Sequence, residues 1–481
     1  MGESMFYGRT QQLEELTELW EKDSASLVSC QGRRRIGKSR LIEEFASCSK
    51  ARFIAIAGLP PQPDIDNDDQ LVSFGRQLAA QSGSQGETPE NWTWAFQMLD
   101  RALDNRRKTV VLLDEISWLG GFDPNFPGEL KNAWDMLFRK RRKLVFVICG
   151  SVSSWITENI LNNTGFAGRI SLQIVLPELP LKDCIRFWGK TANRLATREI
   201  FDILSVTGGV PKYLEEIKPS RSAEENISRL CFRPSGTLFR DFSQIFADVF
   251  GERAILKRAL LTALAEGPKT GQELAAALQC ERNGHLSAHL DELELAGFVA
   301  KDSGLNPETG RASRQDRYRL RDNYTRFYLR YIEPRAAEIK AGLVRAAPLE
   351  TLPGWDAVLG LQFENLILNQ VPELLPLLGF GGLPVLSAAP WRTRGKGKGE
   401  GVQIDLLIQT RKSVCVVEIK RRRRIGEEVE AEVDKKVRAL RVRSGVSVRT
   451  ALVYEGELAP VVRGNGYFDA IVPAASLFEL N

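Results

Sequence analysis

Eight residues near the start of the chain have the types and spacing of a phosphate-binding loop. Residues 32–39 read Gly-Arg-Arg-Arg-Ile-Gly-Lys-Ser and fit the pattern GxxxxGK[ST], between an apolar stretch and a helical pattern. Glycines allow backbone N–H groups to close around phosphates, and the following helix presents its positive end to them. We therefore expect Lys38 to reach the β- and γ-phosphates of a nucleotide and Ser39 to bind Mg²⁺.

Two carboxylates follow a second apolar stretch. Residues 109–115 read Thr-Val-Val-Leu-Leu-Asp-Glu, the pattern of a buried strand that ends in acids. An isolated pair of this kind is commonly solvated, but together with the loop it predicts Asp114 near the magnesium ion and Glu115 near the attacking water. Ser151 follows a third apolar run and is either a sensor of the γ-phosphate or an ordinary turn residue.

A second set of candidate residues lies near the C-terminus. Glu418 and Lys420 alternate along an apolar run and should project to one face of a strand, and Asp405 lies on the run before it. Two carboxylates there would hold Mg²⁺, and the lysine would orient or deprotonate a water. Glu364, on a helical stretch upstream, would complete the set. The alternative is that these polar residues end an exposed hairpin.

The apolar runs that must position these residues suggest several domains. Residues 26–30, 110–113 and 144–149 have the length of buried strands and alternate with helical stretches, which predicts a parallel sheet covered on both faces. We expect an ATPase core over 1–178, a helical lid over 179–250, a winged helix-turn-helix over 251–335 and an α/β domain over 336–481. Residues 59–69 and 394–401 are expected to be loops.

Composition excludes several classes of protein. Of 481 residues, 43% are hydrophobic and 26% charged, and no apolar run is long enough to cross a bilayer. The seven scattered cysteines argue against a disulfide framework or a zinc site. We expect a cytoplasmic protein without a membrane partner. His285 and His289 are interpreted as ordinary surface residues.

Basic residues are concentrated near the C-terminus. Residues 391–450 contain 17 Lys or Arg and 8 Asp or Glu, whereas the whole chain carries a net charge of only +5. This imbalance favours an anionic partner, nucleic acid first, although a solvated surface has the same composition. Arg421–Arg424 would lie beside a phosphate backbone.

The chain resembles the AAA+/STAND-type ATPases, also called archaeal-type or DEXX-box ATPases. The motifs that carry the resemblance are residues 6–9, 32–39, 113–115, 149–151, 168–169 and 208–214. The resemblance implies that Arg169 supplies positive charge to the γ-phosphate, in cis or from a neighbour, unless it forms a structural ion pair. Together, motif and resemblance give these candidate nucleotide contacts: Gly8, Arg9, Gly32, Arg35, Gly37, Lys38, Ser39, Arg40, Asp114, Ser151 and Pro211.

Two further resemblances concern the rest of the chain. The set Glu364, Asp405, Glu418 and Lys420 resembles a PD-(D/E)xK nuclease core, which implies a restriction-endonuclease-like α/β domain. Residues 270–299 resemble a winged helix-turn-helix, but the expected recognition helix carries Asp291, Glu292 and Glu294, which phosphates repel. The wing is the better DNA contact, because residues 309–330 contain seven arginines and two aspartates.

Two hypotheses follow for the function. In the first, the chain binds and hydrolyses ATP with Mg²⁺, and its nucleotide state controls a metal-dependent nuclease that acts on DNA or RNA, DNA being preferred, in defence or as a toxin. In the second, the chain is a regulatory or scaffold ATPase whose C-terminal domain binds nucleic acid or protein without cutting. A helicase is disfavoured, since the sequence contains one phosphate-binding loop and no second motor-like core. The sequence is compatible with a homo-oligomer or with a protein partner.

Overall fold

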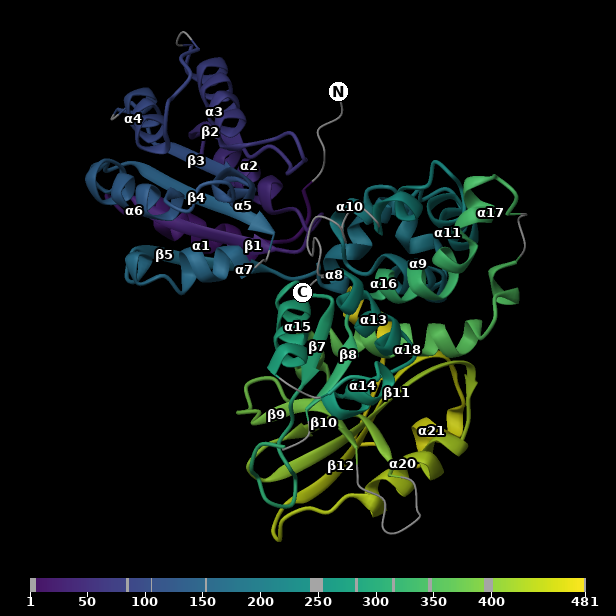
Figure 1. Ribbon diagram of the computed structural model, residues 1–481. Coiled ribbons are helices and arrows are strands. Elements are labelled where there is room, and N and C mark those ends of the chain that lie inside the picture. Colours follow the sequence, from purple (N-terminus) through teal and green to yellow (C-terminus); the bar gives the residue numbers. More distant parts are fainter. Residues whose placement is uncertain are drawn as a thin grey trace. The chain divides into compact units, whose positions relative to one another are not determined.

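The chain divides into two units at Glu178. The computed structural model describes residues 6–83, 86–104, 106–151, 154–242, 254–281, 284–313, 316–344, 348–392 and 401–479. The units are Met1–Glu178 and Leu179–Asn481 (Figure 1). In these described ranges, no helix combines the length and the apolar character that a membrane span requires.

A five-stranded parallel sheet organises the first unit. Its strands are β1 (Ser26–Gly32), β2 (Arg52–Ala57), β3 (Thr109–Asp114), β4 (Leu144–Ser151) and β5 (Ile170–Leu176), in the order β2-β3-β4-β1-β5. The predicted parallel sheet is confirmed, but only its three central strands were predicted. The edge strand β5 lacks a continuous apolar run because Ser171 and Gln173 interrupt it, whereas the partly exposed edge strand β2 has an apolar run at residues 53–57.

Alternation along the strands covers both faces of this sheet. In β3, Val110 and Leu112 pack with α1 (Thr10–Glu21) and α2 (Lys38–Cys48). The intervening Val111 and Leu113 pack against α3 (Asn67–Ser82), α4 (Trp92–Ala102) and α6 (Phe126–Met136) on the other face (Figure 1). The predicted loop at 59–69 is too long, because α3 begins at Asn67.

The remaining elements of the first unit are short. The helix α5 (Ile116–Gly120) follows β3, and a 3-10 helix (Phe138–Lys140) precedes β4. The helix α7 (Ser154–Ile156), a π-helical turn (Thr157–Leu161) and a 3-10 turn (Thr164–Phe166) connect β4 to β5.

Helices begin the second unit. They are α8 (Leu181–Cys184), a 3-10 segment (Ile185–Arg194), α9 (Thr197–Thr207), α10 (Pro211–Leu214) and α11 (Ala223–Cys231). This agrees with the helical pattern predicted after Pro180, although 243–250 lie outside the described residues.

Three helices and a small antiparallel sheet come next. They are α13 (Ala254–Ala265), β6 (Lys269–Thr270), α14 (Gly271–Ala277), α15 (Gly284–Leu295), β7 (Val299–Asp302) and β8 (Arg317–Leu320), with sheet order β6-β8-β7. The chain continues through α16 (Asn323–Phe327), a π-helical turn (Tyr328–Ile332), α17 (Ala336–Lys340) and two 3-10 turns (Glu333–Arg335 and Leu349–Thr351).

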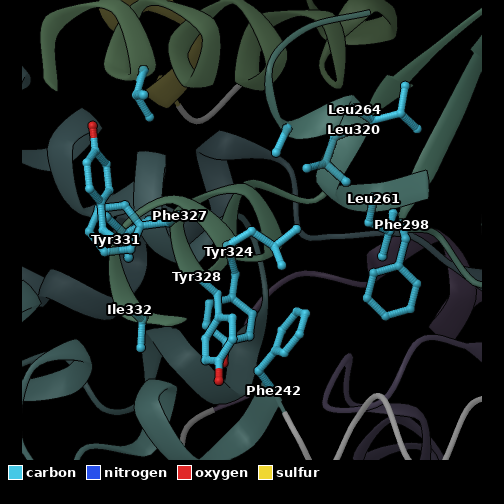
Figure 2. Close-up of a cluster of buried hydrophobic side chains, with 14 of the residues drawn as sticks. Phe242, Leu261, Leu264, Phe298, Leu320, Tyr324, Phe327, Tyr328, Tyr331 and Ile332 are labelled. Atoms are coloured by element: carbon cyan, nitrogen blue, oxygen red, sulfur yellow. The ribbon is translucent and has the colours of Figure 1, made fainter. Parts of the chain in front are cut away.

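One hydrophobic core joins these helices to the small sheet. Figure 2 shows Phe242 beside Tyr328, whose rings are stacked with centroids 4.0 Å apart. Leu261 of α13 and Leu320 of β8 belong to the same core. The segments predicted as lid and winged helix therefore share their buried side chains.

A second five-stranded sheet ends the chain. Its strands are β9 (Ser387–Arg392), β10 (Gln403–Gln409), β11 (Ser413–Ile425), β12 (Ser447–Leu458) and β13 (Ala470–Pro473). Neighbours are antiparallel from β9 to β11 and parallel from β11 to β13. Most of the turn predicted at 394–401 lies outside the described residues.

Helices cover the two faces of this second sheet. Val417 and Ile419 share a core with α18 (Trp355–Leu368) and α19 (Val371–Leu377), whereas Val414 and Val416 share one with α20 (Glu428–Ala439) and α21 (Pro460–Gly464) (Figure 1). A 3-10 turn (Ala474–Phe478) closes the chain. Because side chains alternate along β11, Glu418 belongs to the face that α20 covers.

Gly456 allows β12 to pass a bulge in β11. The register between the two strands shifts between Arg421 and Arg424, and Gly456 has φ 127°. A Cβ at this position would lie 1.7 Å from the carbonyl oxygen of Arg422. Only glycine fits there without moving the backbone.

Gly456→Ala should therefore destabilise the second unit by about 2–3 kcal/mol, because the added methyl group meets backbone rather than a flexible side chain. Thermal unfolding followed by circular dichroism would measure the loss. Gly464→Ala is the matched control, since a Cβ at Gly464 has no neighbour within 4 Å. Equal midpoints for both variants would contradict this account of the bulge.

Candidate nucleotide-binding site and carboxylate cluster

The loop at 32–39 connects β1 to α2 and depends on its glycines. Gly37 has φ 90° at the start of α2, and Arg35 has φ 69°. A Cβ at Gly32 would lie 2.9 Å from Ile36 Cγ2 and 3.0 Å from the Leu176 carbonyl oxygen. The predicted strand-loop-helix context is present, with the loop at the carboxyl end of β1.

Lys38 is folded back over the loop. Its Nζ donates hydrogen bonds to the carbonyl oxygens of Gly32, at 3.1 Å, and Arg33, at 3.3 Å. The side chain is buried. A buried ammonium that donates to neutral carbonyl groups is an electrostatic site for a phosphate, which carries full negative charge.

Ser39 and Asp114 meet as the sequence predicts. The Ser39 hydroxyl donates to Asp114 Oδ2 at 2.5 Å, and the Glu115 backbone N–H donates to Asp114 Oδ1 at 3.0 Å. This contact joins the first turn of α2 to the end of β3. A hydroxyl and a carboxylate oxygen suit Mg²⁺, which prefers oxygen ligands.

Glu115 adopts an unusual backbone conformation beside this pair. Its φ is 49°, in the left-handed region that non-glycine residues seldom adopt. Burial raises the pKa of its carboxyl group and Asp114 raises it further, whereas Lys38 and a backbone hydrogen bond with Ser151 lower it. Lys38, Asp114, Glu115 and Ser151 therefore surround one small region at the ends of β1, β3 and β4.

Arg9 attaches the N-terminal segment to the loop. Its guanidinium donates to the carbonyl oxygens of Ile36, at 3.3 Å, and Pro177, at 2.7 Å. Gly8 precedes it with φ 73°. Arg9 thus lies next to the phosphate-binding loop, whereas Arg40 faces outward, where it pairs with Glu43 and Glu44.

Arg169 forms an ion pair away from the loop. Its Nε and Nη2 each donate to Asp135 at 2.8 Å, and these bonds hold the pKa of Asp135 at about 2. This is the structural ion pair that was one of its two predicted roles. Pro211 begins α10 in the second unit, and its predicted nucleotide contact stays a prediction.

The second candidate site lies where β10 and β11 run side by side. Leu406 pairs with Val417 in the antiparallel register, so the neighbouring residues Asp405 and Glu418 lie next to each other on the two strands. Asp405 Oδ2 accepts a hydrogen bond from the Ile419 backbone N–H at 2.9 Å. Lys420 Nζ lies 2.8 Å from Glu418 Oε1, so the structure brings these three predicted residues together.

Two residues of α20 that the sequence did not indicate complete this cluster. Lys436 Nζ lies 3.2 Å from Asp405 Oδ1 and also donates to Glu418 Oε2. Glu432 Oε2 lies 2.5 Å from Lys420 Nζ. The two residues are four apart and so share one face of the helix, which is the only signal in the sequence that links them.

Burial controls the ionisation of the cluster. It raises the pKa of Asp405 to about 6, with Glu418 adding to the shift. It raises the pKa of Glu364 to about 8, and Asp405 is the second cause, so Glu364 lies within electrostatic reach of the predicted set. Within the described ranges, no three His, Cys, Asp or Glu side chains are arranged to hold a metal ion.

Two expectations about surface residues are wrong. Arg421 is buried with 4% of its side chain exposed, where it pairs with Asp202 and Glu455 instead of facing a phosphate backbone. In the wing, Arg319 is bound to Asp302 and Asn369, and the DNA contact predicted for this arginine-rich segment stays a prediction. His289 is only 4% exposed, because α15 turns it toward the core.

Comparison with known proteins identifies the first site. A phosphate-binding loop and a strand-end carboxylate on a parallel sheet define a P-loop ATPase. Residues 6–217 match the family model of an ATPase domain found predominantly in Archaea. This part of the chain is therefore an ATPase domain of the archaeal type, and it binds ATP.

Two relatives come from Methanocaldococcus jannaschii. An uncharacterized protein is 24% identical over 407 residues, covering 84% of each chain. An uncharacterized ATP-binding protein is 38% identical over 52 residues, covering 11% of this chain and 88% of its own.

Similar solved structures are more distant. A Walker-type ATPase of Pyrococcus abyssi is 15% identical, with 68% of this chain and 96% of that chain covered and a TM-score of 0.47. The Aeropyrum pernix ORC2 protein, in complexes with ADPNP and ADP, is 14% identical, with 71% and 97% covered and a TM-score of 0.41. Because these TM-scores are below 0.5, the assignment of residues 6–217 as an ATPase domain rests on the family match and on the geometry of the loop.

Glu115→Gln should leave ATP binding intact and lower the turnover of ATP roughly 100-fold, because an amide cannot accept a proton from the attacking water. Phosphate release and the retention of radiolabelled ATP would be measured in parallel. Glu43→Gln, on the outward face of α2, is the control. Turnover equal to the wild type would show that another group is the base.

Proposed function

We propose that this chain is an ATPase whose nucleotide state controls a metal-dependent nuclease in its C-terminal part. The observation that carries the proposal is the convergence of Asp405, Glu418 and Lys420 on neighbouring strands. Carboxylate pairs with an adjacent lysine are suited to metal-assisted hydrolysis of phosphodiesters. The proposed substrate is DNA rather than RNA, and a role in defence or as a toxin would follow.

At the ATPase site, the groups around the loop have complementary tasks. Lys38 leaves the carbonyl oxygens of Gly32 and Arg33 to neutralise the β- and γ-phosphates. Ser39 and Asp114 would hold Mg²⁺, which would neutralise charge on the phosphates when bound. Glu115 orients water and takes its proton, and its raised pKa makes it a stronger base than an exposed glutamate.

At the proposed nuclease site, Asp405 and Glu418 would hold Mg²⁺, which would polarise the phosphate when bound. Lys420 orients the attacking water. The oxygen of that water would bond to phosphorus and lose a proton to solvent, the bond from phosphorus to the leaving oxygen would break, and the leaving oxygen would gain a proton from solvent. Glu364 lies close enough to Asp405 for their charges to interact, and it supports the set from α18.

The proposed control would act through α9. This helix lies inside the residues 6–217 that match the ATPase domain, yet it packs within the second unit. The ring of Phe201 contacts that of Phe363, with centroids 5.1 Å apart. Asp202 is paired with Arg421.

These contacts of α9 are adjacent to the candidate catalytic residues. Phe363 directly precedes Glu364 on α18, and Arg421 directly follows Lys420 on β11. The Ser205 carbonyl oxygen of α9 also accepts a hydrogen bond from Gln362 at 2.9 Å. A displacement of α9 with nucleotide state would therefore move both sides of the carboxylate cluster.

The nuclease proposal is tested with the full-length protein, plasmid DNA, single-stranded DNA and RNA. We expect cleavage with Mg²⁺ or Mn²⁺ that falls at least 100-fold in Asp405→Asn and Lys420→Met, because each change removes a group that binds metal or water. Lys435→Gln, an exposed lysine of α20, is the control. Cleavage that survives in both site variants would refute the proposal.

The path through α9 makes a separate prediction. Asp202→Asn removes the charge that holds Arg421 and should weaken the dependence of cleavage on ATP by several fold, with ATP hydrolysis retained. Cleavage rates with and without ATP would be compared. Glu215→Gln, which breaks an exposed ion pair with Lys212 instead, should behave as wild type. Unchanged ATP dependence in Asp202→Asn would exclude this route.

The second candidate is a regulatory or scaffold ATPase that binds nucleic acid or protein without cutting. One observation favours it: an ammonium group, that of Lys436, lies between the two carboxylates that would hold the metal. The cleavage assay separates the candidates. Retained nucleic-acid binding with no cleavage under any metal or nucleotide condition would support the second.

A further inference from the structure

Lys436 occupies the position that a divalent cation would take in the carboxylate cluster. We propose that its ammonium group is an internal cation that keeps this metal site closed and that a divalent metal must displace it to bind. The inference deepens the proposed nuclease function and rests on it. Lys436 would then set the metal affinity of the C-terminal site.

The hydrogen bonds within the cluster show which oxygens are in competition. Asp405 Oδ2 accepts from the Ile419 backbone N–H, and Glu418 Oε1 lies 2.8 Å from Lys420 Nζ. The other oxygen of each carboxylate, Asp405 Oδ1 and Glu418 Oε2, is bound to Lys436 Nζ. A metal that binds each carboxylate through the oxygen opposite its strand contact would take the same two oxygens that Lys436 holds.

Burial explains why a cation is needed there without metal. Glu418 is 0% and Asp405 8% exposed, and two adjacent carboxylates in such a place repel each other. Lys436 compensates this charge from α20 with 14% of its side chain exposed. Lys420 cannot do so alone, because it also lies 2.5 Å from Glu432.

Displacement is compatible with the geometry of α20. Lys436 reaches the cluster with the end of a long, flexible side chain, so its ammonium can withdraw without movement of the helix. Val433, on the same helix, stays fixed in the core. A withdrawn ammonium would remain beside the metal, where an anionic phosphate group can bind it.

Mn²⁺ binding to the full-length, nucleotide-free protein tests the inference. Free Mn²⁺ would be measured by electron paramagnetic resonance. We expect Lys436→Gln to bind Mn²⁺ at least about 10-fold more tightly than the wild type, because the metal no longer competes with an ammonium. Lys436→Arg, which keeps the charge, and Lys435→Gln, which removes one from the exposed face, should bind like the wild type. Asp405→Asn should abolish the tighter binding.

A second measurement needs no substitution. An amine-reactive acylating reagent followed by peptide mass spectrometry should modify Lys436 slowly in the wild type, because both carboxylates hold its ammonium. Saturating Mn²⁺ should increase that modification several fold and leave Lys435 unchanged. This experiment decides the matter even if Lys436→Gln does not fold.

The outcomes separate this inference from the nuclease proposal. Unchanged or weaker Mn²⁺ affinity in folded Lys436→Gln, or equal labelling of Lys436 with and without Mn²⁺, overturns the inference even where cleavage depends on Asp405. Tighter Mn²⁺ binding in Lys436→Gln supports the inference, and an absence of cleavage in the same preparations would count against the nuclease proposal alone.

Discussion

Carboxylates buried at the ends of strands must be compensated by cations or hydrogen-bond donors, and both candidate sites follow from this constraint. At the end of β3, Ser39 binds Asp114 and Lys38 lowers the pKa of Glu115. Between β10 and β11, lysines bind Asp405 and Glu418. Each site is thus arranged for positive charge, which a metal or a protein ammonium can supply.

The two sites differ in what supplies that charge. The phosphate-binding loop holds Lys38 against carbonyl groups, so the ammonium is poised for an incoming phosphate. In the C-terminal cluster the lysine is bound to the carboxylates themselves, so a metal has to compete with it. The helix α9 lies within the residues that match the ATPase domain, and it contacts the helix and the strand that carry this second cluster.

The sequence predicted those features whose signal is local. The loop at 32–39 and the central strands were recognisable because the motif is contiguous and the strands are continuously apolar. The edge strand β5 has polar residues between its apolar ones, and Lys436 lies 16 residues after Lys420 on another element, so neither gave a local pattern. The prediction that Arg421 faces a phosphate backbone was wrong because its partner Asp202 is 219 residues away in the chain and leaves no local pattern.

Calorimetric titration of the folded, full-length protein with ATP and Mg²⁺ tests the central claim most directly. The account predicts binding of one ATP per chain through the loop at 32–39, with affinity at least about 100-fold weaker in Lys38→Ala, which loses the ammonium that faces the phosphates. A folded wild-type protein that shows no heat of ATP binding would contradict the account. A Lys38→Ala variant that binds ATP as tightly as the wild type would contradict it too.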